Sequence, residues 1–437
     1  MTSPTRTTPS ESLPWPAPCA LGPVDADIAL PGSKSATNRA LVLAALAEGT
    51  SVVRRPLRSR DTLLMTAGLR ALGVAVTDDG SDWRVVGSGR PLRPAAAAVD
   101  VGNAGTVARF LPPVAALAAG EVRFDGDARM RERPIGALLA ALRAIGVEID
   151  DGGRGALPAA VRGTGRVTGG PVLIDASSSS QLVSGLLLAA PRFERGLYLR
   201  HEGGRLPSAP HLAMTVAMLR AAGAEVDDDV PAQWAVSPGP LRACVWDVEP
   251  DLSSAAPFLA AAMLTGGRVR VAGWPLATTQ PGGRLPGLLE RMGGTYRLDA
   301  AGLTLDGPGR VHGLDADLGE VGELTPVLAA LAALADSPSR LSGVAHLRLQ
   351  ETDRLAALAR EINALGGSVT ETADGLSIAP RPLRGGVFAT YDDHRLAMAA
   401  AVLGLAVQGV SVENVATTAK TLPGFVELWD RMLGAPV

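Results

Sequence analysis

A helix that ends in glycine recurs six times along the chain, at intervals of about 70 residues. The glycines are Gly73, Gly146, Gly223, Gly293, Gly366 and Gly434. Glycine directly after a helix is typical of the left-handed residue that closes the last turn. Each of the first five is followed by two short apolar runs around a polar turn, which predicts a β-hairpin. The chain is therefore expected to contain six copies of one supersecondary unit.

A second set of helices alternates with the first. These helices are rich in Ala, Leu and Val and begin near Asn38, Thr106, Ser179, Ser253, Leu324 and His394. A helix that is apolar on most sides is predicted to be buried on most sides. Each unit then reads as strand, buried helix, strand, surface helix and hairpin, which places the chain in the α/β class.

Two domains of three units are favoured over one ring of six, because a single core rarely extends over 437 residues. The three residues after Gly434 are too few for a sixth hairpin, whereas residues 27–30 offer an unassigned strand. We expect the N-terminal segment to complete the last unit. One domain would comprise residues 1–30 and 249–437, and the other residues 31–248. The two crossings would form a hinge, with a ligand site in the cleft between the domains.

Composition excludes several classes of function. The net charge is −3, which does not favour nucleic acid as a partner. Cys19 and Cys244 form neither a disulfide framework nor a metal-ligand cluster, and the histidines are dispersed. The sequence has no apolar run long enough for a transmembrane helix, and residues 1–20 read as a polar tail without a signal-peptide core. A cytoplasmic protein without a metal is expected.

Residues 31–39 (PGSKSATNR) predict an anion site at the start of the first buried helix. Only two of the 41 basic residues are lysines, Lys34 and Lys420, which suggests that an ammonium group is required at both positions. Ser35, Thr37 or Asn38 can cap the helix, and Lys34 and Arg39 lie near its N-terminus, where backbone N–H groups favour anions. The alternative is an ordinary capped helix with two solvated cations.

The other buried helices start with similar polar residues. These starts are residues 102–106, 177–181, 251–254, 322–325 and 392–395. If the helices are parallel within a domain, their positive ends face one cleft that suits an anionic substrate. Simple capping is the alternative, and it is favoured for residues 251–254. In residues 350–355, Glu351 can form a helix ion pair with Arg354 or act as a proton-transfer group.

Taken together, these motifs resemble the 3-phosphoshikimate 1-carboxyvinyltransferase (EPSP synthase) family. They occur in the family's order over nearly the whole chain. The motifs are Pro31-Gly32-Ser33-Lys34-Ser35, Asn38-Arg39, Asn103-Ala104-Gly105-Thr106, Arg131-Glu132-Arg133-Pro134, Ser179-Ser180-Gln181, Glu351-Thr352-Asp353-Arg354, Asp393-His394-Arg395 and Ala419-Lys420-Thr421.

The resemblance implies a fold and a reaction. The fold is an inside-out α/β barrel of two similar domains, each with three βαβαββ repeats. The reaction transfers the enolpyruvyl group of phosphoenolpyruvate to the 5-hydroxyl of shikimate 3-phosphate and releases phosphate by addition and elimination. This step belongs to the shikimate pathway, on the way to chorismate and the aromatic amino acids. The family uses no cofactor, works in the cytoplasm and is usually monomeric.

The resemblance also implies roles for individual residues. Shikimate 3-phosphate would be bound by Lys34, Ser35, Arg39, Ser179, Ser180, Gln181, Ser208, Glu323 and Gln350. Phosphoenolpyruvate would be bound by Lys34, Gly105, Arg133, Gln181, Arg354, Arg395 and Lys420. Catalysis would involve Lys34, Glu323, Glu351 and His394, with Glu351 as the proton donor to the methylene carbon and Glu323 as the base for the 5-hydroxyl. Planar guanidinium groups suit two-point binding of carboxylate and phosphate.

The chain departs from the family pattern at three positions. Glu323 stands where many members have Asp, Gln350 where many have Lys, and Phe110 where Pro is frequent. Gln350 removes a cation from the shikimate side, so its contact with substrate is left open. Gly105 resembles the glycine that leaves room for glyphosate, so we expect a glyphosate-sensitive enzyme.

Two other functions are compatible with parts of this pattern. UDP-N-acetylglucosamine enolpyruvyltransferase shares the fold, but it typically carries a loop cysteine near the second repeat and a Lys-Asn motif, and this chain has neither. A non-catalytic repeat protein that binds anions would bind tightly without turnover. The concentration of charge at the helix starts argues against it.

Overall fold

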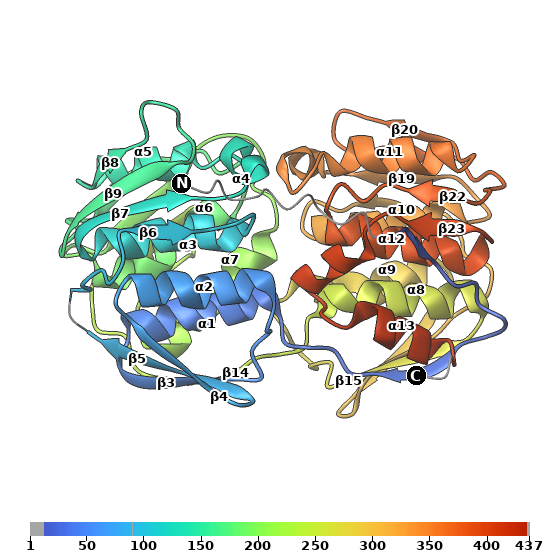
Figure 1. Ribbon diagram of the computed structural model, residues 1–437, viewed down its shortest axis with the longest axis horizontal. Helices are drawn as coiled ribbons and strands as arrows, with labels where there is room; N and C mark the ends of the chain where they lie inside the picture. The colour runs from blue at the N-terminus through green and yellow to red at the C-terminus, as the bar shows by residue number, and fades with distance from the viewer. Residues whose placement is uncertain (1–12, 90, 435–437) are drawn as a thin grey trace, which may run out of the picture.

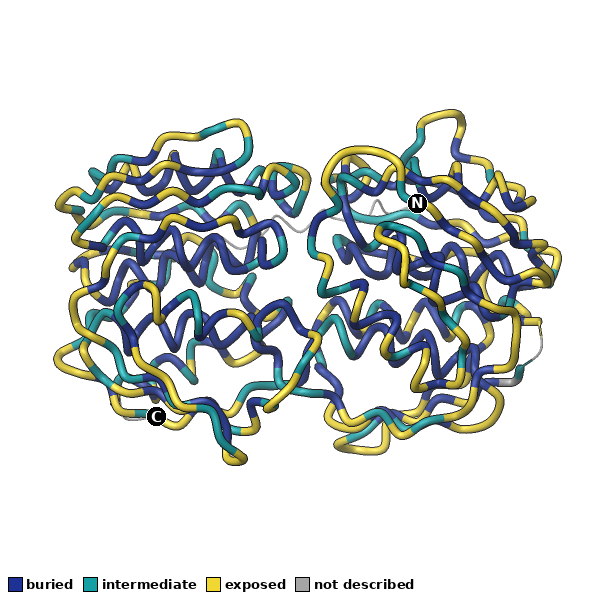
Figure 2. Tube along the Cα trace, turned by 180° about the vertical axis from the view of Figure 1, so that it is seen from behind, coloured by how far each residue is buried: buried dark blue, intermediate teal, exposed yellow. Residues whose placement is uncertain are grey.

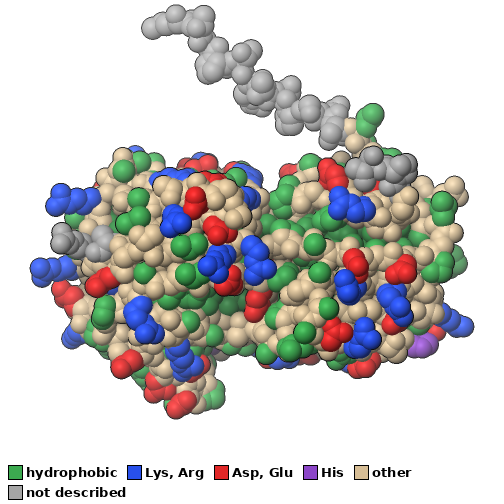
Figure 3. Space-filling model, turned by 90° about the horizontal axis from the view of Figure 1, so that it is seen from below, with side chains coloured by type: hydrophobic (Ala, Val, Ile, Leu, Met, Phe, Trp, Pro, Cys, Tyr) green, Lys and Arg blue, Asp and Glu red, His purple; other side chains and the backbone are tan. Residues whose placement is uncertain are grey.

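The computed structural model describes residues 13–89 and 91–434, which form two lobes side by side (Figure 1). Each lobe has its own hydrophobic core. One core contains residues between 40 and 248, and the other contains residues 17–28 and 252–432. Within the described ranges, no helix is both long and apolar enough to cross a membrane. Acidic and basic side chains alternate over the face seen in Figure 3, in keeping with the small net charge.

The predicted βαβαββ unit is confirmed, with one small sheet in each unit. In the second unit β6 (Ala98–Asp100) runs parallel to β7 (Ala119–Asp125), which pairs antiparallel with β9 (Ala159–Thr164), and β9 pairs with β8 (Glu148–Asp150). The described residues form five four-stranded sheets and one three-stranded sheet. Hydrogen bonds do not join these sheets to one another, so the inner helices hold each lobe together.

The first lobe contains three units, and in the first of them a strand from residues 245–247 takes the opening position. The first unit consists of β14 (Val245–Asp247), α1 (Lys34–Leu46), β3 (Glu48–Arg54), α2 (Arg60–Ala71), β4 (Ala75–Asp79) and β5 (Asp82–Ser88). The second consists of β6 (Ala98–Asp100), α3 (Gly105–Ala116), β7 (Ala119–Asp125), α4 (Ala128–Glu132), α5 (Gly136–Ala144), β8 (Glu148–Asp150) and β9 (Ala159–Thr164). The third consists of β10 (Gly170–Ile174), α6 (Gln181–Ala189), η1 (Ala190–Arg192), β11 (Leu197–His201), α7 (Ala209–Ala221), β12 (Val226–Asp227) and β13 (Gln233–Val236).

The second lobe repeats this order and takes two strands from the N-terminal segment. The fourth unit consists of β2 (Asp25–Ile28), η2 (Leu252–Ala255), α8 (Ala256–Thr265), β15 (Arg268–Ala272), η3 (Pro281–Arg284), α9 (Leu285–Arg291), β16 (Thr295–Asp299) and β17 (Gly302–Asp306). The fifth consists of β18 (Asp315–Asp317), η4 (Gly322–Leu324), α10 (Thr325–Ala333), β19 (Ser339–Ser342), η5 (Ala345–Leu349), α11 (Arg354–Ala364), β20 (Val369–Glu371) and β21 (Leu376–Ile378). The sixth consists of β22 (Gly386–Phe388), α12 (His394–Ala406), β23 (Val410–Val412), η6 (Val415–Lys420), α13 (Phe425–Met432) and β1 (Trp15–Pro16).

Three buried helices form the centre of each lobe. In the first lobe α1, α3 and α6 all contact one another, and in the second lobe α8, α10 and α12 do the same. Their Ala, Leu and Val residues are almost all buried, and the inner trace is accordingly mostly dark blue in Figure 2. The six glycines that follow the outer helices all have positive φ, between 76° and 104°, which confirms the predicted C-terminal caps.

The strand expected to complete the last unit pairs elsewhere. The predicted strand at residues 27–30 corresponds to β2, which runs parallel to β15 and opens the fourth unit. The last unit is completed by the earlier strand β1, which pairs antiparallel with β23. Periodicity locates a strand but does not specify its partner, since pairing depends on contacts far away in the sequence.

The chain passes between the lobes twice, and the two crossing segments lie side by side. The N–H of Ser33 donates to the carbonyl oxygen of Glu249 (2.8 Å), and the N–H of Asp251 donates to that of Pro31 (2.9 Å). The crossings therefore form a short antiparallel pair at the base of α1 and η2. This pair fixes the starts of two inner helices next to each other at the boundary between the lobes.

Candidate active site

A cavity of about 120 Å³ lies between the lobes, where the starts of all six inner helices meet. This common orientation is the one expected for parallel helices. Residues from these starts that line the cavity are Ser33, Lys34, Ser35, Gly105, Thr106, Ser179, Ser180, Gln181, Asp251, Ser253, Glu323, His394 and Arg395. Starts of outer helices and the turns before them add Arg133, Ser208, His211, Gln280, Gln350, Glu351 and Arg354. Among the predicted site residues, Arg39 and Lys420 are the two that do not line it.

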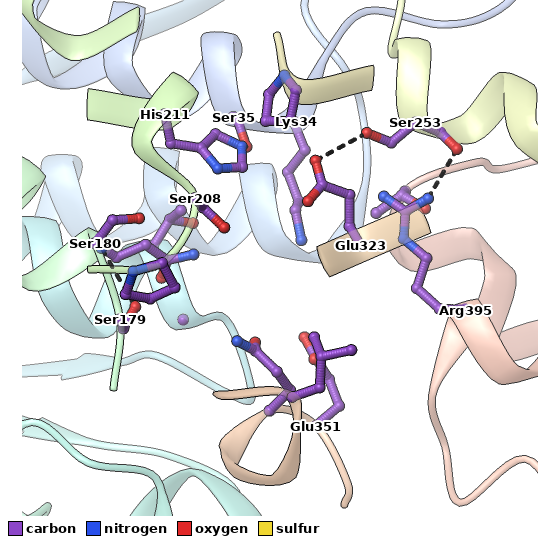
Figure 4. A pocket seen from close by; sticks show the side chains of 18 of the residues that line it. Lys34, Ser35, Ser179, Ser180, Ser208, His211, Ser253, Glu323, Glu351 and Arg395 are labelled. Carbon is purple, nitrogen blue, oxygen red and sulfur yellow. Dashed lines mark hydrogen bonds between the residues drawn. The ribbon is translucent and has the colours of Figure 1, made fainter. Parts of the chain in front are cut away.

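Lys34 is the first residue of α1 and lies in the middle of the cavity (Figure 4). Its Nζ is 3.1 Å from Oδ2 of the buried Asp61, which comes from α2. Its backbone N–H donates to Oδ2 of Asp251 across the lobe boundary (3.3 Å). The ammonium group is thus held in the cavity by one carboxylate while it keeps other donors for a ligand.

The caps at these two helix starts differ partly from expectation. Ser33 caps α1, since its Oγ accepts from the N–H of Ala36 (3.4 Å). The predicted caps Ser35, Thr37 and Asn38 are wrong because the helix already begins at Lys34. The capping reading of residues 251–254 is confirmed, with Oδ1 of Asp251 accepting from Ser254 (3.1 Å).

Arg39 lies behind the cavity, in the core of the first lobe. Its guanidinium donates to Thr215 Oγ1 (2.7 Å), Ser184 Oγ (3.2 Å), and the carbonyl oxygens of Ser35 (3.0 Å) and His211 (3.1 Å). It also lies 5.2 Å from the ring centre of Phe110, one of the departures from the family pattern. Burial lowers the pKa of Arg39 to about 9, so the group remains charged at neutral pH. A direct contact with shikimate 3-phosphate stays a prediction.

His211 contributes to the serine-rich side of the cavity and was missed in the sequence. Figure 4 shows it beside Ser35, near Ser179, Ser180 and Ser208. Its Nε2 lies 3.4 Å from Oγ of Ser35. Burial, followed by the charge of Arg39, lowers the pKa of His211 to about 3, so the imidazole is neutral. Its place three residues after Ser208, just inside a helix start, was the available signal.

Ser208 has a strained backbone and touches both lobes. Its φ of +53° lies in the left-handed region, which is unusual for serine. Its N–H donates to the carbonyl oxygen of Gly319 in the second lobe (2.9 Å). The bond from Ser208 to Gly319 therefore helps to hold Ser208 in the left-handed conformation that orients its hydroxyl.

Gly105 lies where three polar groups converge. A Cβ at this position would be 2.7 Å from Nη1 of Arg109, 2.9 Å from Nη2 of Arg133 and 3.0 Å from Oε1 of Gln181. Arg109 is buried beneath them and donates to Gln181 Oε1 (3.3 Å) and to the carbonyl oxygens of Gly105 (3.3 Å) and Pro134 (3.1 Å). Because Oε1 of Gln181 accepts this bond, its amide NH₂ is free to donate to a ligand.

Glu351 is a buried carboxylate surrounded by cations. Oε1 is 2.7 Å from Nζ of Lys420 and 3.9 Å from Nη1 of Arg133, while Oε2 accepts from Nη2 of Arg354 (2.9 Å). Burial alone would raise the pKa of Glu351, but the charges of Lys420, Arg133 and Arg354 outweigh burial and hold that pKa well below its usual value. Glu351 is therefore ionised in this state.

The second partner of Arg354 explains the motif at residues 392–395. Nε of Arg354 donates to Oδ2 of the fully buried Asp393 (2.7 Å), whose Oδ1 accepts from the N–H of Arg395 (2.8 Å). Asp393 thus caps α12 and orients Arg354 toward Glu351. Its capping position gave no hint of this second contact, which joins the starts of α11 and α12.

Glu323 faces the cavity from the opposite side. Its Oε1 accepts from Oγ of Ser253 (3.3 Å), and the carbonyl oxygen of Ser253 accepts from Nη1 of Arg395 (3.0 Å), as Figure 4 shows. Burial raises the pKa of Glu323, opposed by the charge of Arg395 and by the Ser253 hydrogen bond. The cavity thus presents two carboxyl groups whose surroundings shift their pKa values in opposite directions, an arrangement suited to separate proton-transfer roles.

Two further histidines line the cavity in neutral form. Burial and then the charge of Arg395 hold the pKa of His394 well below its usual value. Burial and then Arg354 lower the pKa of His346 to about 4. His346 was not identified from the sequence, because it lies in η5 between motifs and carries no neighbouring pattern. The side chain of Gln350, the second departure, also borders the cavity.

Comparisons with known proteins agree with this arrangement. A family model described as EPSP synthase (3-phosphoshikimate 1-carboxyvinyltransferase) matches residues 20–429. Two solved structures of EPSP synthase from Acinetobacter baumannii are each 26% identical, cover 96% of this chain and 97% of their own, and have TM-scores of 0.78 and 0.77. The enolpyruvyl transferase NikO from Streptomyces tendae is 20% identical with the same coverage and a TM-score of 0.74, which shows a common fold.

Proposed function

The chain belongs to the EPSP synthase family, and we propose that the cavity between its lobes is the active site for enolpyruvyl transfer. The reaction moves the enolpyruvyl group of phosphoenolpyruvate to the 5-hydroxyl of shikimate 3-phosphate, a step of aromatic biosynthesis. Both substrates carry phosphate and carboxylate groups. The observation that carries the proposal is the pairing of Glu351, within its cluster of cations, with Glu323 on the other side of the same cavity.

We propose that phosphoenolpyruvate occupies the cationic part of the cavity. Arg133, Arg354 and Lys420 converge on Glu351 and can turn their donors to a phosphate or carboxylate group. Arg395 lies toward Glu323, and Gln181 and Gly105 border the same space. Lys34, between the two lobes, is placed to contact both substrates.

The serine-rich side then suits shikimate 3-phosphate. Ser35, Ser179, Ser180 and Ser208 present hydroxyls from three helix starts, and His211 adds a neutral ring nitrogen next to them. Backbone N–H groups at helix starts also favour the phosphate. Glu323 and Gln350, on the opposite wall, would face the ring hydroxyls, and Arg39 would support this side from behind.

The two carboxyl groups divide the chemistry. Glu351 gives a proton to C3 of phosphoenolpyruvate while Glu323 takes the proton of the 5-hydroxyl, and the hydroxyl oxygen bonds to C2. The tetrahedral intermediate then returns a proton from C3 to the ionised Glu351, the C–H electron pair forms the C2–C3 double bond, and the C2–O bond to phosphate breaks so that phosphate leaves with its electron pair. Neutral His394 is placed beside Glu351 to support this exchange. Positioning and electrostatic complementarity contribute most of the rate.

We further propose that the lobes are two domains that close over the substrates. Their boundaries would be residues 31–248 for one domain and 1–30 with 249–437 for the other, of which residues 1–12 and 435–437 lie outside the described ranges. The paired crossing segments at residues 31–33 and 249–251 are suited to act as the hinge. By analogy with the metabolic role of the family, the protein would act as a cytoplasmic monomer without an added cofactor.

Phosphate release provides the direct test. Phosphoenolpyruvate is mixed with the protein and either shikimate 3-phosphate or UDP-N-acetylglucosamine. Release only with shikimate 3-phosphate is expected. Release only with UDP-N-acetylglucosamine would assign the other activity of this fold. Tight binding of shikimate 3-phosphate without release in either tube would instead indicate a binding protein.

A further inference from the structure

Arg129 reaches from one lobe to the backbone of Glu351 in the other. It belongs to α4, and its Nε lies 3.2 Å from the carbonyl oxygen of Gln350 and 3.1 Å from that of Glu351. Its Nη2 donates to the carbonyl oxygen of Gln350 as well (3.0 Å). Nη1 is held by Oε2 of Glu132 in the same helix (2.8 Å), which orients the guanidinium.

These carbonyl groups are available because a helix ends there. Gln350 follows η5 directly, and the last carbonyl groups of a helix lack partners within it. A cation at such an end is favoured by the helix dipole. Arg129 therefore completes the end of η5 from across the cleft, a contact that requires the two lobes to be together.

Arg129 and Arg133 act on the same residue. Arg129 lies within the short helix α4, and Arg133 is the extended residue that directly follows this helix. Arg133 lies 3.9 Å from the Glu351 carboxylate, whereas Arg129 binds the backbone of the same residue. One short segment of the first lobe thus holds Glu351 by both its main chain and its side chain.

We propose that Arg129 is a positioning residue that fixes Glu351 in its reactive position when the lobes are together. The proposal rests on the role of Glu351 as proton donor given above. Arg129 does not line the cavity, so it acts through Glu351 and not through a substrate. Without the bond from Arg129, the first lobe would no longer hold the backbone of Glu351, and the distance from Glu351 to the substrates could vary.

The first test compares three variants. Because a displacement of about 1 Å can cost 100-fold in rate, we expect Arg129→Met to lower kcat by about 100-fold. Arg129→Lys keeps the charge but offers a single nitrogen, so it should recover part of this loss. Arg131→Met is the matched control, since Arg131 lies on the same helix and pairs with Asp125 within the first lobe. It should retain activity and have the same melting temperature as Arg129→Met.

A double-mutant cycle separates positioning from general structural damage. If Arg129 acts through Glu351, Arg129→Met should lower the residual rate of Glu351→Gln by much less than it lowers the wild-type rate. The same loss in both backgrounds would overturn the proposal, as would an Arg129→Met enzyme as active as Arg131→Met. If Glu351→Gln has no measurable rate, equal losses in Arg129→Met and Arg129→Lys would overturn it.

The proposed function and the positioning role of Arg129 fail in different experiments. A wild-type protein without phosphate release in the presence of shikimate 3-phosphate would refute the proposed function. A Glu351→Gln variant with the wild-type rate would refute the role of Glu351. In an active enzyme that depends on Glu351, only the Arg129 variants decide whether the lobe-crossing contact positions it.

Discussion

Glu351 is ionised among its cations although its proposed role requires a proton. The same three cations that hold its pKa down, Lys420, Arg133 and Arg354, are those proposed to bind phosphoenolpyruvate. An anionic ligand would neutralise part of their field and so raise the pKa of Glu351. Binding of phosphoenolpyruvate would therefore cause Glu351 to take up the proton that it later donates.

This model predicts proton uptake by Glu351 when phosphoenolpyruvate binds. Calorimetric titration with an inert phosphonate analogue, in the presence of shikimate 3-phosphate, should give heats that depend on the ionisation enthalpy of the buffer. The Glu351→Gln variant is the control, because it removes this uptake but keeps any protonation change of the ligand. We expect the wild type to take up about one proton more than the variant. Equal uptake would contradict the model.

Glu323 should set the acidic limit of activity. A base must be deprotonated, and burial raises the pKa of Glu323 above its ordinary value. The rate should therefore fall as the pH drops through this raised pKa, and the acidic limb of kcat/KM should lie above the range of an ordinary glutamate. Because general base catalysis typically contributes about 10²- to 10⁴-fold, Glu323→Gln should lower kcat by this factor. Near-normal turnover of Glu323→Gln would refute its role.

At the residue scale, the sequence located residues of the cavity wherever they formed a pattern. Lys34, one of two lysines among many arginines, lies in the centre of the cavity, and the helix-start motifs surround it. His211 and His346 were missed because histidines were examined only for the close spacing that metal sites require. These two histidines reach the cavity from different repeat units and have no such spacing. Capping was the alternative considered for residues 392–395, and the bond from Arg354 to Asp393 joins residues too far apart in sequence for any local pattern to reveal it.

At the scale of elements, the start of α3 places Gly105 against the cation-binding part of the site. We predict that Gly105→Ala raises the KM for phosphoenolpyruvate and reduces inhibition by glyphosate, because a Cβ would press on Arg109, Arg133 and Gln181. The core face of α3 is untouched, so the melting temperature should change little. Steady-state kinetics with and without glyphosate provide the measurement. A wild-type enzyme unaffected by millimolar glyphosate at limiting phosphoenolpyruvate would contradict the expected sensitivity.

Arg39 ties together the helices of the first lobe. Its bonds to Ser184 on α6 and Thr215 on α7 join both helices to α1, and its contact with Phe110 adds α3. Since each buried group left unpaired costs about 1–3 kcal/mol, Arg39→Ala should destabilise the protein by several kcal/mol. Denaturant unfolding measures this loss. A variant of wild-type stability that has lost shikimate 3-phosphate binding would instead place Arg39 at the ligand.

The helices and hairpins were predictable because glycine caps and apolar runs act locally. Strand partners were not, since β14 pairs with β3 and β2 pairs with β15, each across more than 190 residues of sequence. The repeat indicated that the sixth unit lacked a hairpin, but periodicity could not show that β1, two residues long, supplies its last strand. Local signals thus determine elements, while the chain's two crossings determine which sheet each strand joins.

At the scale of the whole molecule, a surface ion pair connects the lobes beside Ser208. Arg205 in the first lobe pairs with Asp317 in the second. Its guanidinium lies next to Gly319 and Gly343, where a Cβ would approach it to 2.7 and 2.9 Å. The neighbouring bond from Ser208 N–H to Gly319 links this contact to the serine-rich side of the cavity. The pair therefore favours the arrangement in which Ser208 is set for binding.

We predict that Arg205→Asp favours the open arrangement and that the exchange Arg205→Asp/Asp317→Arg restores the closed one. Because an exposed ion pair contributes only about 0–1 kcal/mol, the closed population should change by at most about fivefold, and high salt should reduce the difference. Small-angle scattering of the unliganded protein should give a larger radius of gyration for the single variant, and its KM for shikimate 3-phosphate should rise. Failure of the exchange to recover both values would show that Arg205 acts by some contact other than this pair.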